Sequence, residues 1–197
     1  MQKYTNFRTA ELDGCIVSHN HGDHAAYIYQ YIRAGIEVYG NMEVAEKHPG
    51  VHLIPERQRW KIGHFEVVPF NLPHEGVENY GYLIKTQSCT WTLFATDFEY
   101  FPMHFRNMKI ANWIIAVNHD EVSDNHPARE HVLLGHSSVD TVKNILAVNK
   151  TKAMKNVLLI HMSDSIDRRA AVEAIGKPLR SVCVQAVKEG EVLTIYG

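Results

Sequence analysis

The sequence contains little cysteine, no long apolar run and no excess of positive charge. Its three cysteines (Cys15, Cys89 and Cys183) are an odd number without close spacing, which argues against a disulfide framework or a cysteine-rich zinc module. We expect them to be small buried residues in a reducing compartment. No stretch approaches the roughly 18 apolar residues needed to span a bilayer, and residues 1–20 carry no cleavage-site pattern. We therefore expect a soluble, cytoplasmic protein without a membrane partner.

The charge balance also limits the classes of function. The formal net charge is −2, from 20 basic and 22 acidic residues, so no overall basic field indicates nucleic-acid binding. A local basic channel is still compatible with this balance, because only local charge matters for binding a polyanion. The length of 197 residues, with 45% hydrophobic and 21% charged residues, predicts one globular domain over residues 1–197.

Short β-branched runs alternate with helical stretches along the chain, and this predicts a layered α/β architecture. The expected strands are Cys15–Ser18, Glu37–Tyr39, Val51–Ile54, His64–Phe70, Tyr80–Lys85, Thr90–Ala95, Trp113–Val117 and Val157–Ile160. The expected helices are His24–Ala34, Met42–Lys47, Ser138–Val148 with Ser138 as N-cap, and Asp167–Ala174. A hairpin of Val182–Val187 and Val192–Ile195 is expected to end the fold.

The strongest motif lies among the 13 histidines. Residues 15–24 read Cys-Ile-Val-Ser-His-Asn-His-Gly-Asp-His, so an apolar strand runs into a His-x-His-x-Asp-His pattern. His19 and His21 are two residues apart and point to the same side of an extended backbone. Gly22 permits a sharp turn, after which Asp23 and His24 begin a helix. Imidazole and carboxylate ligands suit zinc, manganese or iron, so the motif predicts a metal site.

This motif resembles the signature of the metallo-β-lactamase superfamily, which folds as an αββα sandwich with metals at an edge between two sheets. The resemblance extends from about Asp13 to the C-terminus. It implies further ligands at strand ends, and three residues stand there in the expected order: His74, Asp97 and His161. On this resemblance, one ion is held by His19, His21 and His74, a second by Asp23, His24 and His161, and Asp97 bridges them.

Two ions roughly 3.5–4 Å apart can share a water and lower its pKa toward neutrality. The resulting hydroxide is the expected nucleophile, and open coordination positions would stabilise charge in the transition state. Asp23 could orient the hydroxide or accept its proton. We therefore predict a hydrolase with two divalent ions, zinc first and manganese or iron as alternatives, and with Asp23, Asp97 and His136 as catalytic residues.

The substrate is predicted from a narrower resemblance, to the YycJ/WalJ-like branch of small cytosolic proteins linked to DNA exonuclease activity. The motifs that carry it are Gly81-Tyr82-Leu83-Ile84, Ala95-Thr96-Asp97, Asn118-His119-Asp120 and Gly135-His136-Ser137-Ser138. His136 precedes a helix N-terminus, which is a plausible phosphate site. We expect His119, His136 and Ser137 to contact a phosphodiester substrate, DNA or RNA, although loop packing and capping explain His119 and His136 equally well.

Several alternatives remain open. Arg129, Lys143 and the lysines of residues 150–155 could follow a nucleic-acid backbone, or could be a solvated helix end. A thioester or lactone hydrolase is the alternative enzyme. The superfamily normally has several strands before the His-x-His motif, and only about 18 residues precede it here. Part of the first sheet is therefore expected to be missing, which would favour a truncated non-catalytic metal-binding protein, or a homodimer that completes the sheet edge.

Overall fold

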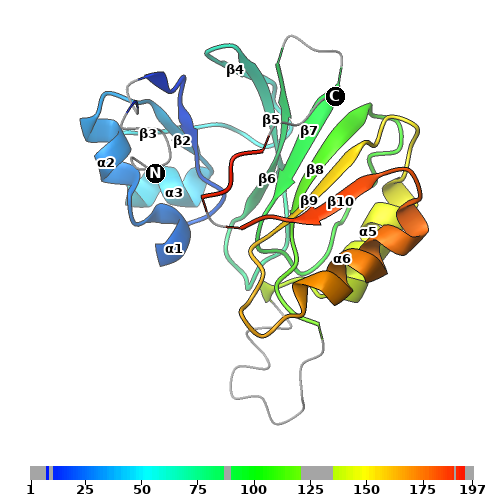
Figure 1. Ribbon diagram of the computed structural model, residues 1–197. Helices are drawn as coiled ribbons and strands as arrows, with labels where there is room; N and C mark the ends of the chain where they lie inside the picture. The colour runs from blue at the N-terminus through cyan, green and yellow to red at the C-terminus, as the bar shows by residue number, and fades with distance from the viewer. Residues whose placement is uncertain (1–7, 9–10, 87–89, 121–134, 189, 194–197) are drawn as a thin grey trace.

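In a computed structural model, described for residues 8, 11–86, 90–120, 135–188 and 190–193, two β-sheets lie against each other between layers of helices (Figure 1). The first sheet has the strand order β1-β2-β3, and the second has the order β10-β9-β8-β7-β6-β5-β4. Helices α1 to α3 lie beside the first sheet, and α5 and α6 cover the outer face of the second. The predicted αββα sandwich is thus confirmed.

The bounds of the elements follow the apolar runs. The first sheet consists of β1 (Cys15–Ile16), β2 (Val38–Gly40) and β3 (Val51–Leu53), all parallel. The second consists of β4 (Trp60–Ile62), β5 (Phe65–Asn71), β6 (Tyr80–Lys85), β7 (Trp91–Ala95), β8 (Ile110–Ala116), β9 (Asn156–Ile160) and β10 (Cys183–Ala186). Neighbours from β4 to β7 are antiparallel, and neighbours from β7 to β10 are parallel.

The helices are α1 (Gly22–Ala25), α2 (Ile28–Arg33), α3 (Met42–Lys47), α5 (Val139–Asn149) and α6 (Arg168–Gly176), followed by the 3-10 helix η2 (Lys177–Leu179). Polar side chains cap three of these helices at the N-terminus. Asn41 accepts a hydrogen bond from the Val44 amide, Ser138 from the Thr141 amide, and Asp167 from two amides of α6. The predicted N-cap at Ser138 is therefore confirmed.

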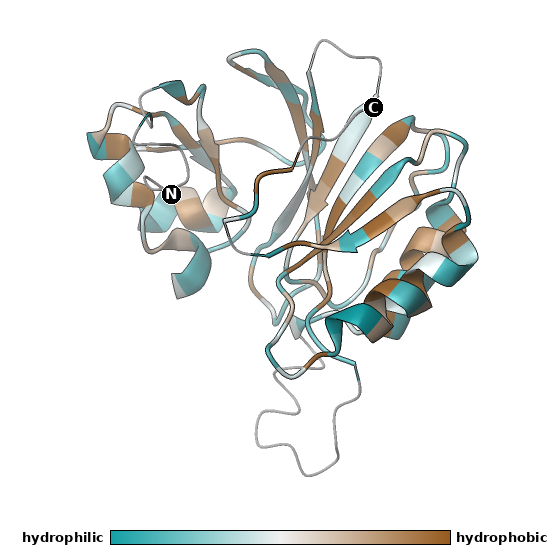
Figure 2. Ribbon diagram, in the orientation of Figure 1, coloured by the Kyte–Doolittle hydropathy of each residue, from teal (hydrophilic) through white to brown (hydrophobic). Residues whose placement is uncertain are grey.

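The largest core cluster lies between the second sheet and helices α5 and α6. The side chains of Trp113, Leu146, Leu159 and Ile175 are almost fully buried there. Figure 2 shows hydrophobic segments along the central strands, whereas hydrophilic and hydrophobic residues alternate around α5 and α6. Burial on both faces explains why β8 and β9 read as continuous apolar runs in the sequence.

Tyr82 links the two sheets. Its side chain is fully buried, and its hydroxyl donates a 2.6 Å hydrogen bond to the main-chain carbonyl of Val17, beside β1. The Tyr80 amide donates to the carbonyl of Ser18 at 2.9 Å. Strand β6 therefore fixes the position of the segment that continues directly into the His-x-His motif.

Four details differ from the sequence predictions. The helix expected over His24–Ala34 is two helices, because Tyr27 leaves helical geometry with φ −105° and ψ 9°. Strand β4 has only three residues, too few for its alternation to stand out. The expected C-terminal hairpin is not formed within the described residues, because β10 pairs in parallel with β9 and Val192 and Leu193 lie outside any strand. Thr194 and Ile195 of this hairpin lie outside the described residues.

The fourth difference concerns the cysteines. Cys183 is exposed on the edge strand β10, and Cys15 is half-buried, so the prediction of buried residues is wrong for Cys183; Cys89 lies outside the described residues. An apolar sequence context does not reveal that β10 is the last strand of the sheet, with one side unpaired within the described residues. None of the described helices is long and apolar enough to cross a membrane.

Candidate metal centre

The ends of four strands bring the seven predicted ligands together. Strand β6 is antiparallel to both of its neighbours, β5 and β7, and strands β7, β8 and β9 are parallel to one another. Strands β5, β7 and β9 therefore run in the same direction. Their carboxyl ends meet at one edge of the sheet. His74 follows β5, Asp97 follows β7 and His161 follows β9, while the His-x-His motif follows β1 in the facing sheet.

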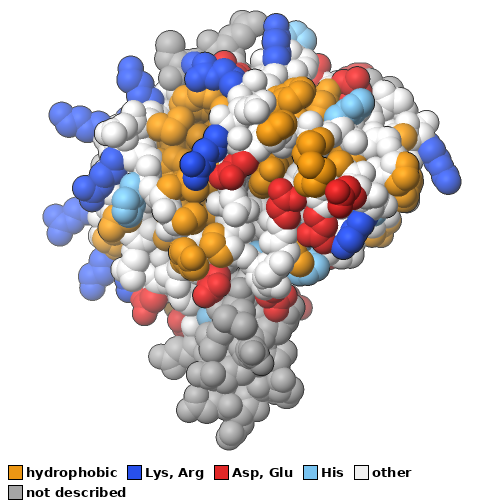
Figure 3. Space-filling model, turned by 180° about the vertical axis from the view of Figure 1, so that it is seen from behind, with side chains coloured by type: hydrophobic (Ala, Val, Ile, Leu, Met, Phe, Trp, Pro, Cys, Tyr) orange, Lys and Arg blue, Asp and Glu red, His pale blue; other side chains and the backbone are white. Residues whose placement is uncertain are grey.

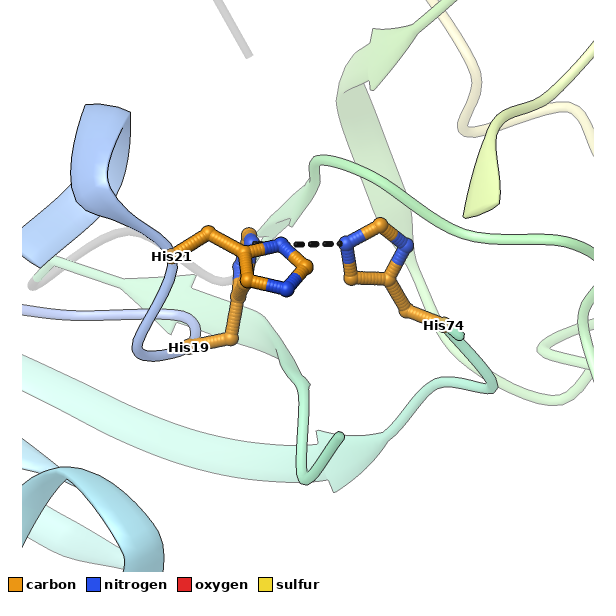
Figure 4. A group of neighbouring side chains, drawn as sticks. All are labelled: His19, His21 and His74. Carbon is orange, nitrogen blue, oxygen red and sulfur yellow. Dashed lines mark hydrogen bonds between the residues drawn. The ribbon is translucent and has the colours of Figure 1, made fainter. Parts of the chain in front are cut away.

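The first group consists of three imidazoles that point toward one another (Figure 4). His21 Nδ1 lies 3.1 Å from His19 Nε2 and 3.1 Å from His74 Nε2. His19 is fully buried and His74 almost so, and His21 is half-buried. Three ring nitrogens that converge in this way form a set of donors that could hold one divalent ion.

The hydrogen bond at the far side of His74 fixes which nitrogen carries the proton. His74 Nδ1 lies 2.6 Å from the main-chain carbonyl oxygen of Gly135, which can only accept. Nδ1 must therefore carry the hydrogen, so in the neutral ring Nε2 directs its lone pair at His19 and His21. A carbonyl that orients the imidazole in this way is a usual feature of histidine ligands.

The second group consists of Asp23, His24, Asp97 and His161, whose candidate ligand atoms all lie within 4.8 Å of one another. His24 Nε2 lies 2.6 Å from Asp97 Oδ2 and 3.2 Å from Asp23 Oδ2. His161 Nε2 lies 3.6 Å from Asp23 Oδ2, and its ring stacks on that of His24 at 5.5 Å.

Asp97 lies between the two groups. Its Oδ2 is 3.8 Å from His19 Nε2 as well as close to His24, so one carboxylate faces both sets of imidazoles. Its Oδ1 is buried and accepts no hydrogen bond from the described residues, although His136 Nδ1 and His161 Nδ1 approach within 3.4 and 3.5 Å. A buried carboxylate oxygen without a donor is costly, and a bound cation would satisfy it. The residues of both groups therefore fit a bound metal ion.

The electrostatics of the centre favour neutral imidazole and ionised carboxylate, which are the forms that bind metal. Burial, and then repulsion from His24 and His74, lower the pKa of His19 to about 3. Burial also lowers the pKa of His74. Burial alone would raise the pKa of Asp97, but contacts with His136, His24 and His161 outweigh it and hold that pKa well below its usual range.

His24 is the exception within the centre. Burial lowers its pKa, but the hydrogen bond and charge of Asp97, together with the charge of Asp23, outweigh burial and raise it. Burial and the charge of Asp97 raise the pKa of Asp23, but the charge of His24, a main-chain hydrogen bond and the charge of His161 outweigh them and lower it. Each of His24 and Asp97 therefore stabilises the charged form of the other, across a separation of 2.6 Å.

The exposure of the side chains defines an open side of the centre. Asp97 is 3% exposed and His24 15%, whereas His161 is 30% and Asp23 66% exposed. His19 and His74 thus lie at the buried end of the centre, and a substrate would approach from the exposed side, where Asp23 and His161 lie.

Two of the candidate ligands have an unusual backbone conformation. Asp97 and His161 have positive φ angles of 43° and 53°, in the left-handed region that non-glycine residues rarely adopt. Such conformations persist only where the surroundings hold them. For Asp97 the surroundings include Asn79, a fully buried residue whose side-chain amide donates to the main-chain carbonyls of Thr96 and Asp97.

We predict that Asn79→Ala weakens metal binding by about ten- to a hundredfold, the usual effect of losing a partner that orients a ligand. The physical reason is that the Asp97 backbone loses the hydrogen bond that holds its left-handed conformation. Competition between the protein and a chromophoric chelator would measure the affinity.

Asn149→Ala is the matched control for this prediction. Asn149 is also buried, and it bonds to Ile145 and Phe105 at the C-terminal end of α5, away from the ligands. An equal loss of affinity in both variants would show that general destabilisation, rather than the position of Asp97, causes the effect.

The three residues predicted to contact substrate have different surroundings. His136 lies at the centre, with a side chain 13% exposed and Nδ1 3.4 Å from Asp97 Oδ1. His119 is half-buried, and its Nε2 lies 3.3 Å from the main-chain oxygen of His136, so it supports the segment that carries His136. Ser137 is buried, and its hydroxyl donates to the Ala116 carbonyl at 2.7 Å. Substrate contact by these residues stays a prediction.

Sequence reasoning missed several residues that support the ligands. Asn118, which was noted only as part of the Asn118-His119-Asp120 motif, lies two residues after strand β8 and contacts Nδ1 and the main-chain oxygen of His161 at 3.2 and 3.4 Å. Asn41 is fully buried and donates to the carbonyls of Ser18 and Glu78 while it caps α3. The position of Asn118 after an apolar strand could have identified it, because Asp97 and His161 were found by the same signal.

Comparisons with known proteins give a fold rather than a family. No family model matches the sequence, and no curated protein matches it. Solved structures do match. The metallo-β-lactamase fold protein YhfI from Bacillus subtilis is 18% identical, with a TM-score of 0.72 over 96% of this chain and 80% of that one.

Two further structures have the same fold. A diphosphatase of the PhnP family is 15% identical, with a TM-score of 0.63 over 94% of this chain and 72% of that one. An isothiocyanate hydrolase from Delia radicum gut bacteria is 12% identical, with a TM-score of 0.63 over 98% of this chain and 79% of that one. The protein therefore has the metallo-β-lactamase fold, and this expectation from the sequence is confirmed.

Proposed function

We propose that this protein is a cytoplasmic, dinuclear metal-dependent hydrolase that cleaves phosphodiester bonds in nucleic acid. The observation that carries the proposal is the convergence of two ligand groups on Asp97, a buried carboxylate with one oxygen unsatisfied by the described residues. A fold alone does not determine an activity. The activity must therefore be inferred from the side chains of the centre.

The division of the ligands supports two ions rather than one. His19, His21 and His74 would hold the first, and Asp23, His24 and His161 the second, with Asp97 shared. Such a pair of ions, zinc being our first choice, supplies an activated water and a Lewis acid for the oxygen that gains charge. Asp23 is the most exposed of these groups, and it would orient the attacking water or accept its proton.

His136 extends the centre beyond the metal ligands. Its Nδ1 faces Asp97, and its Nε2, at the opposite side of the ring, would donate to a phosphate oxygen or protonate the leaving oxygen. It stands two residues before Ser138, the N-cap of helix α5, whose N-terminal amides favour a negative charge. His119 would hold the loop that carries His136 in place.

The sequence supports a nucleic-acid substrate through its resemblance to the YycJ/WalJ-like branch, in particular Asn118-His119-Asp120 and Gly135-His136-Ser137-Ser138. Two proteins of the same fold, a diphosphatase and an isothiocyanate hydrolase, act on different chemical groups. The substrate must therefore be tested directly against the alternative of a thioester or lactone hydrolase.

The test compares substrates on the metal-loaded protein. We expect hydrolysis of bis-p-nitrophenyl phosphate and of linear double-stranded DNA, and little hydrolysis of an acyl thioester. His161→Ala should abolish the phosphodiester activity, whereas the control His52→Ala, which alters an exposed histidine of β3, should retain it. Hydrolysis of the thioester alone would favour the alternative enzyme, and hydrolysis of neither would favour a non-catalytic metal-binding protein.

A further inference from the structure

Three loops at the edge of the second sheet opposite the metal centre are strongly basic. Residues 104–109, 150–155 and 177–182, the last of which include the 3-10 helix η2, precede the parallel strands β8, β9 and β10, so the three loops lie at the amino ends of these strands. Together they contain seven of the 20 Lys and Arg residues and none of the 22 Asp and Glu residues. We call the seven the basic edge: Arg106, Lys109, Lys150, Lys152, Lys155, Lys177 and Arg180.

The main chain holds the three loops side by side. The Lys155 amide donates to the Ala111 carbonyl, and the Lys155 carbonyl accepts from the Cys183 amide, both at 2.8 Å. Lys150 Nζ donates to the Pro178 carbonyl at 3.1 Å, and Arg106 Nε donates to the Val148 carbonyl at the end of α5. The basic edge is therefore one continuous surface built from segments that are distant in the sequence.

All seven side chains are exposed, and none forms an ion pair with a described residue. Elsewhere the basic residues are often neutralised, as in the pairs Lys47–Glu43 and Arg59–Glu66. Figure 3 shows Lys and Arg side chains along the side of the molecule where α5 and α6 lie, and Asp and Glu side chains gathered toward the other side. The rest of the chain carries 13 basic and 22 acidic residues, a formal charge of −9, so the net charge of −2 conceals a strong separation of charge.

Favourable interactions between basic side chains and the C-terminal ends of helices explain only part of this surface. Lys150 and Lys177 stand at the C-terminal ends of α5 and α6, where a cation is favourable. Lys109, Lys152 and Lys155 precede strands or lie within a loop, and their side chains make no hydrogen bond or ion pair with described residues. A set of exposed, unneutralised cations attracts a polyanion.

We infer that the basic edge binds the phosphate backbone of a nucleic acid whose scissile bond lies at the metal centre; this inference rests on the proposed function. Strand β9 separates Lys155 from His161 by six residue steps, which at about 3.3 Å each is about 20 Å. Phosphates of one strand are about 3.4 Å apart along a duplex axis, so a substrate must exceed about six nucleotides to reach both sites.

The apolar residues of the three loops favour a nucleic acid over an anionic membrane. Phe105, Met154 and Leu179 of these loops are buried. One large hydrophobic residue near them, Val148, is exposed, but it belongs to the end of helix α5 and not to the loops. Membrane-surface segments combine basic residues with exposed apolar anchors. The basic edge offers charge without such an anchor among its described residues.

The test uses a double charge reversal at the basic edge, Lys152→Glu with Lys155→Glu. The matched control is Arg33→Glu with Lys61→Glu, which reverses two exposed basic residues elsewhere and changes the net charge equally. The probe is a fluorescent single strand of about 20 nucleotides with cleavage-resistant phosphorothioate links, and its Kd for the metal-loaded protein is measured by anisotropy at several salt concentrations.

The edge variant should bind the probe at least about tenfold more weakly, with a slope of log K against log salt shallower by about 1.4, for two lost phosphate contacts. Hydrolysis of bis-p-nitrophenyl phosphate, which is too small to reach the edge, should be unchanged in both variants. Equal affinity in the edge variant, or an equal loss in the control, would overturn the inference.

Two further measurements separate the other outcomes. Binding of the wild-type protein to vesicles with about 30% anionic lipid but not to the probe would overturn the inference in favour of a membrane. The wild-type protein could instead have a mass in solution above that of one chain, and the edge variant could lose this association without a change in probe binding. That result would overturn the inference in favour of a second copy of this chain as the partner of the basic edge. Loss of probe binding in the edge variant, in a protein that hydrolyses no phosphodiester, would uphold the basic edge and refute the proposed activity.

Discussion

Replacement of Asp97 by alanine is expected to lower kcat/KM for bis-p-nitrophenyl phosphate by more than about a hundredfold, since loss of a partner that only orients a ligand already costs about ten- to a hundredfold. Asp97 is the residue that faces both ligand groups, 3.8 Å from His19 Nε2 and 2.6 Å from His24 Nε2. Its removal should also reduce the metal content, because the second group keeps one carboxylate, and that one is largely exposed. Elemental analysis of the purified variant and steady-state kinetics measure the two effects.

Two further variants make this prediction specific. Asp97→Asn keeps the size and one oxygen but removes the charge, so we expect an intermediate metal content and a rate near that of the alanine variant. Asp164→Ala removes an exposed carboxylate that follows β9 without joining the ligand groups, and it should behave like the wild type. Full activity and two ions per chain in Asp97→Ala would remove Asp97 from the centre.

Asp97 and His161 could be identified from the sequence because each closely follows an apolar strand. The three central residues of β9 are buried, and β7 alternates between buried and half-buried residues, so the titratable side chain after each strand, Asp97 or His161, is conspicuous. The His-x-His-x-Asp-His motif is local, and its geometry depends on a few adjacent residues. A single sequence can therefore predict ligands that lie close together in the chain or that follow a strand.

The supporting residues could not be predicted in this way. Asn79 acts on the main chain of Asp97, 18 residues further along the sequence, and Gly135 accepts from His74 across 61 residues. Main-chain partners leave no chemical signal in the sequence, because any residue offers a carbonyl. The short strand β4 and the break at Tyr27 were missed for a related reason, since packing rather than periodicity decides them.

The basic edge shows the same limit for a surface. Of the five basic residues that we predicted could follow a nucleic-acid backbone, Lys150, Lys152 and Lys155 belong to the basic edge, and a solvated helix end explains these lysines equally well from the sequence alone. Lys143 instead pairs with Asp140, and Arg129 lies outside the described residues. Arg106 and Lys109 come from one loop and Lys177 and Arg180 from another, and the parallel order of β8, β9 and β10 brings all of them to one end of the sheet. The separation of charge is thus a property of the topology, and it is invisible in a net charge of −2.

Removal of metal is expected to lower the melting temperature of the protein by at least about 8 °C. A ligand at about a thousandfold its Kd stabilises the folded state by about 4 kcal/mol per site. For a chain of about 200 residues, each kcal/mol corresponds to about 2–4 °C. Calorimetry of the protein before and after dialysis against a chelator measures the shift, and restored metal should reverse it.

The physical reason for this shift is the arrangement of the first ligand group. His19 is fully buried with its pKa lowered to about 3, and its Nε2 lies 3.1 Å from His21 Nδ1. His74 directs a lone pair at the same point, because its other nitrogen donates to Gly135. Without a cation, lone pairs on neutral rings face one another, and protonation to relieve this is opposed by burial.

A variant that cannot hold metal provides the control for the thermal experiment. His21→Ala combined with His161→Ala removes one ligand from each group while leaving the fully buried His19 in place. Its melting temperature should not respond to chelator, and it should resemble that of the metal-free wild type. A wild-type protein whose melting temperature is equally indifferent to chelator would show that the seven side chains meet for a reason other than metal binding, and the proposed hydrolase would lose its premise.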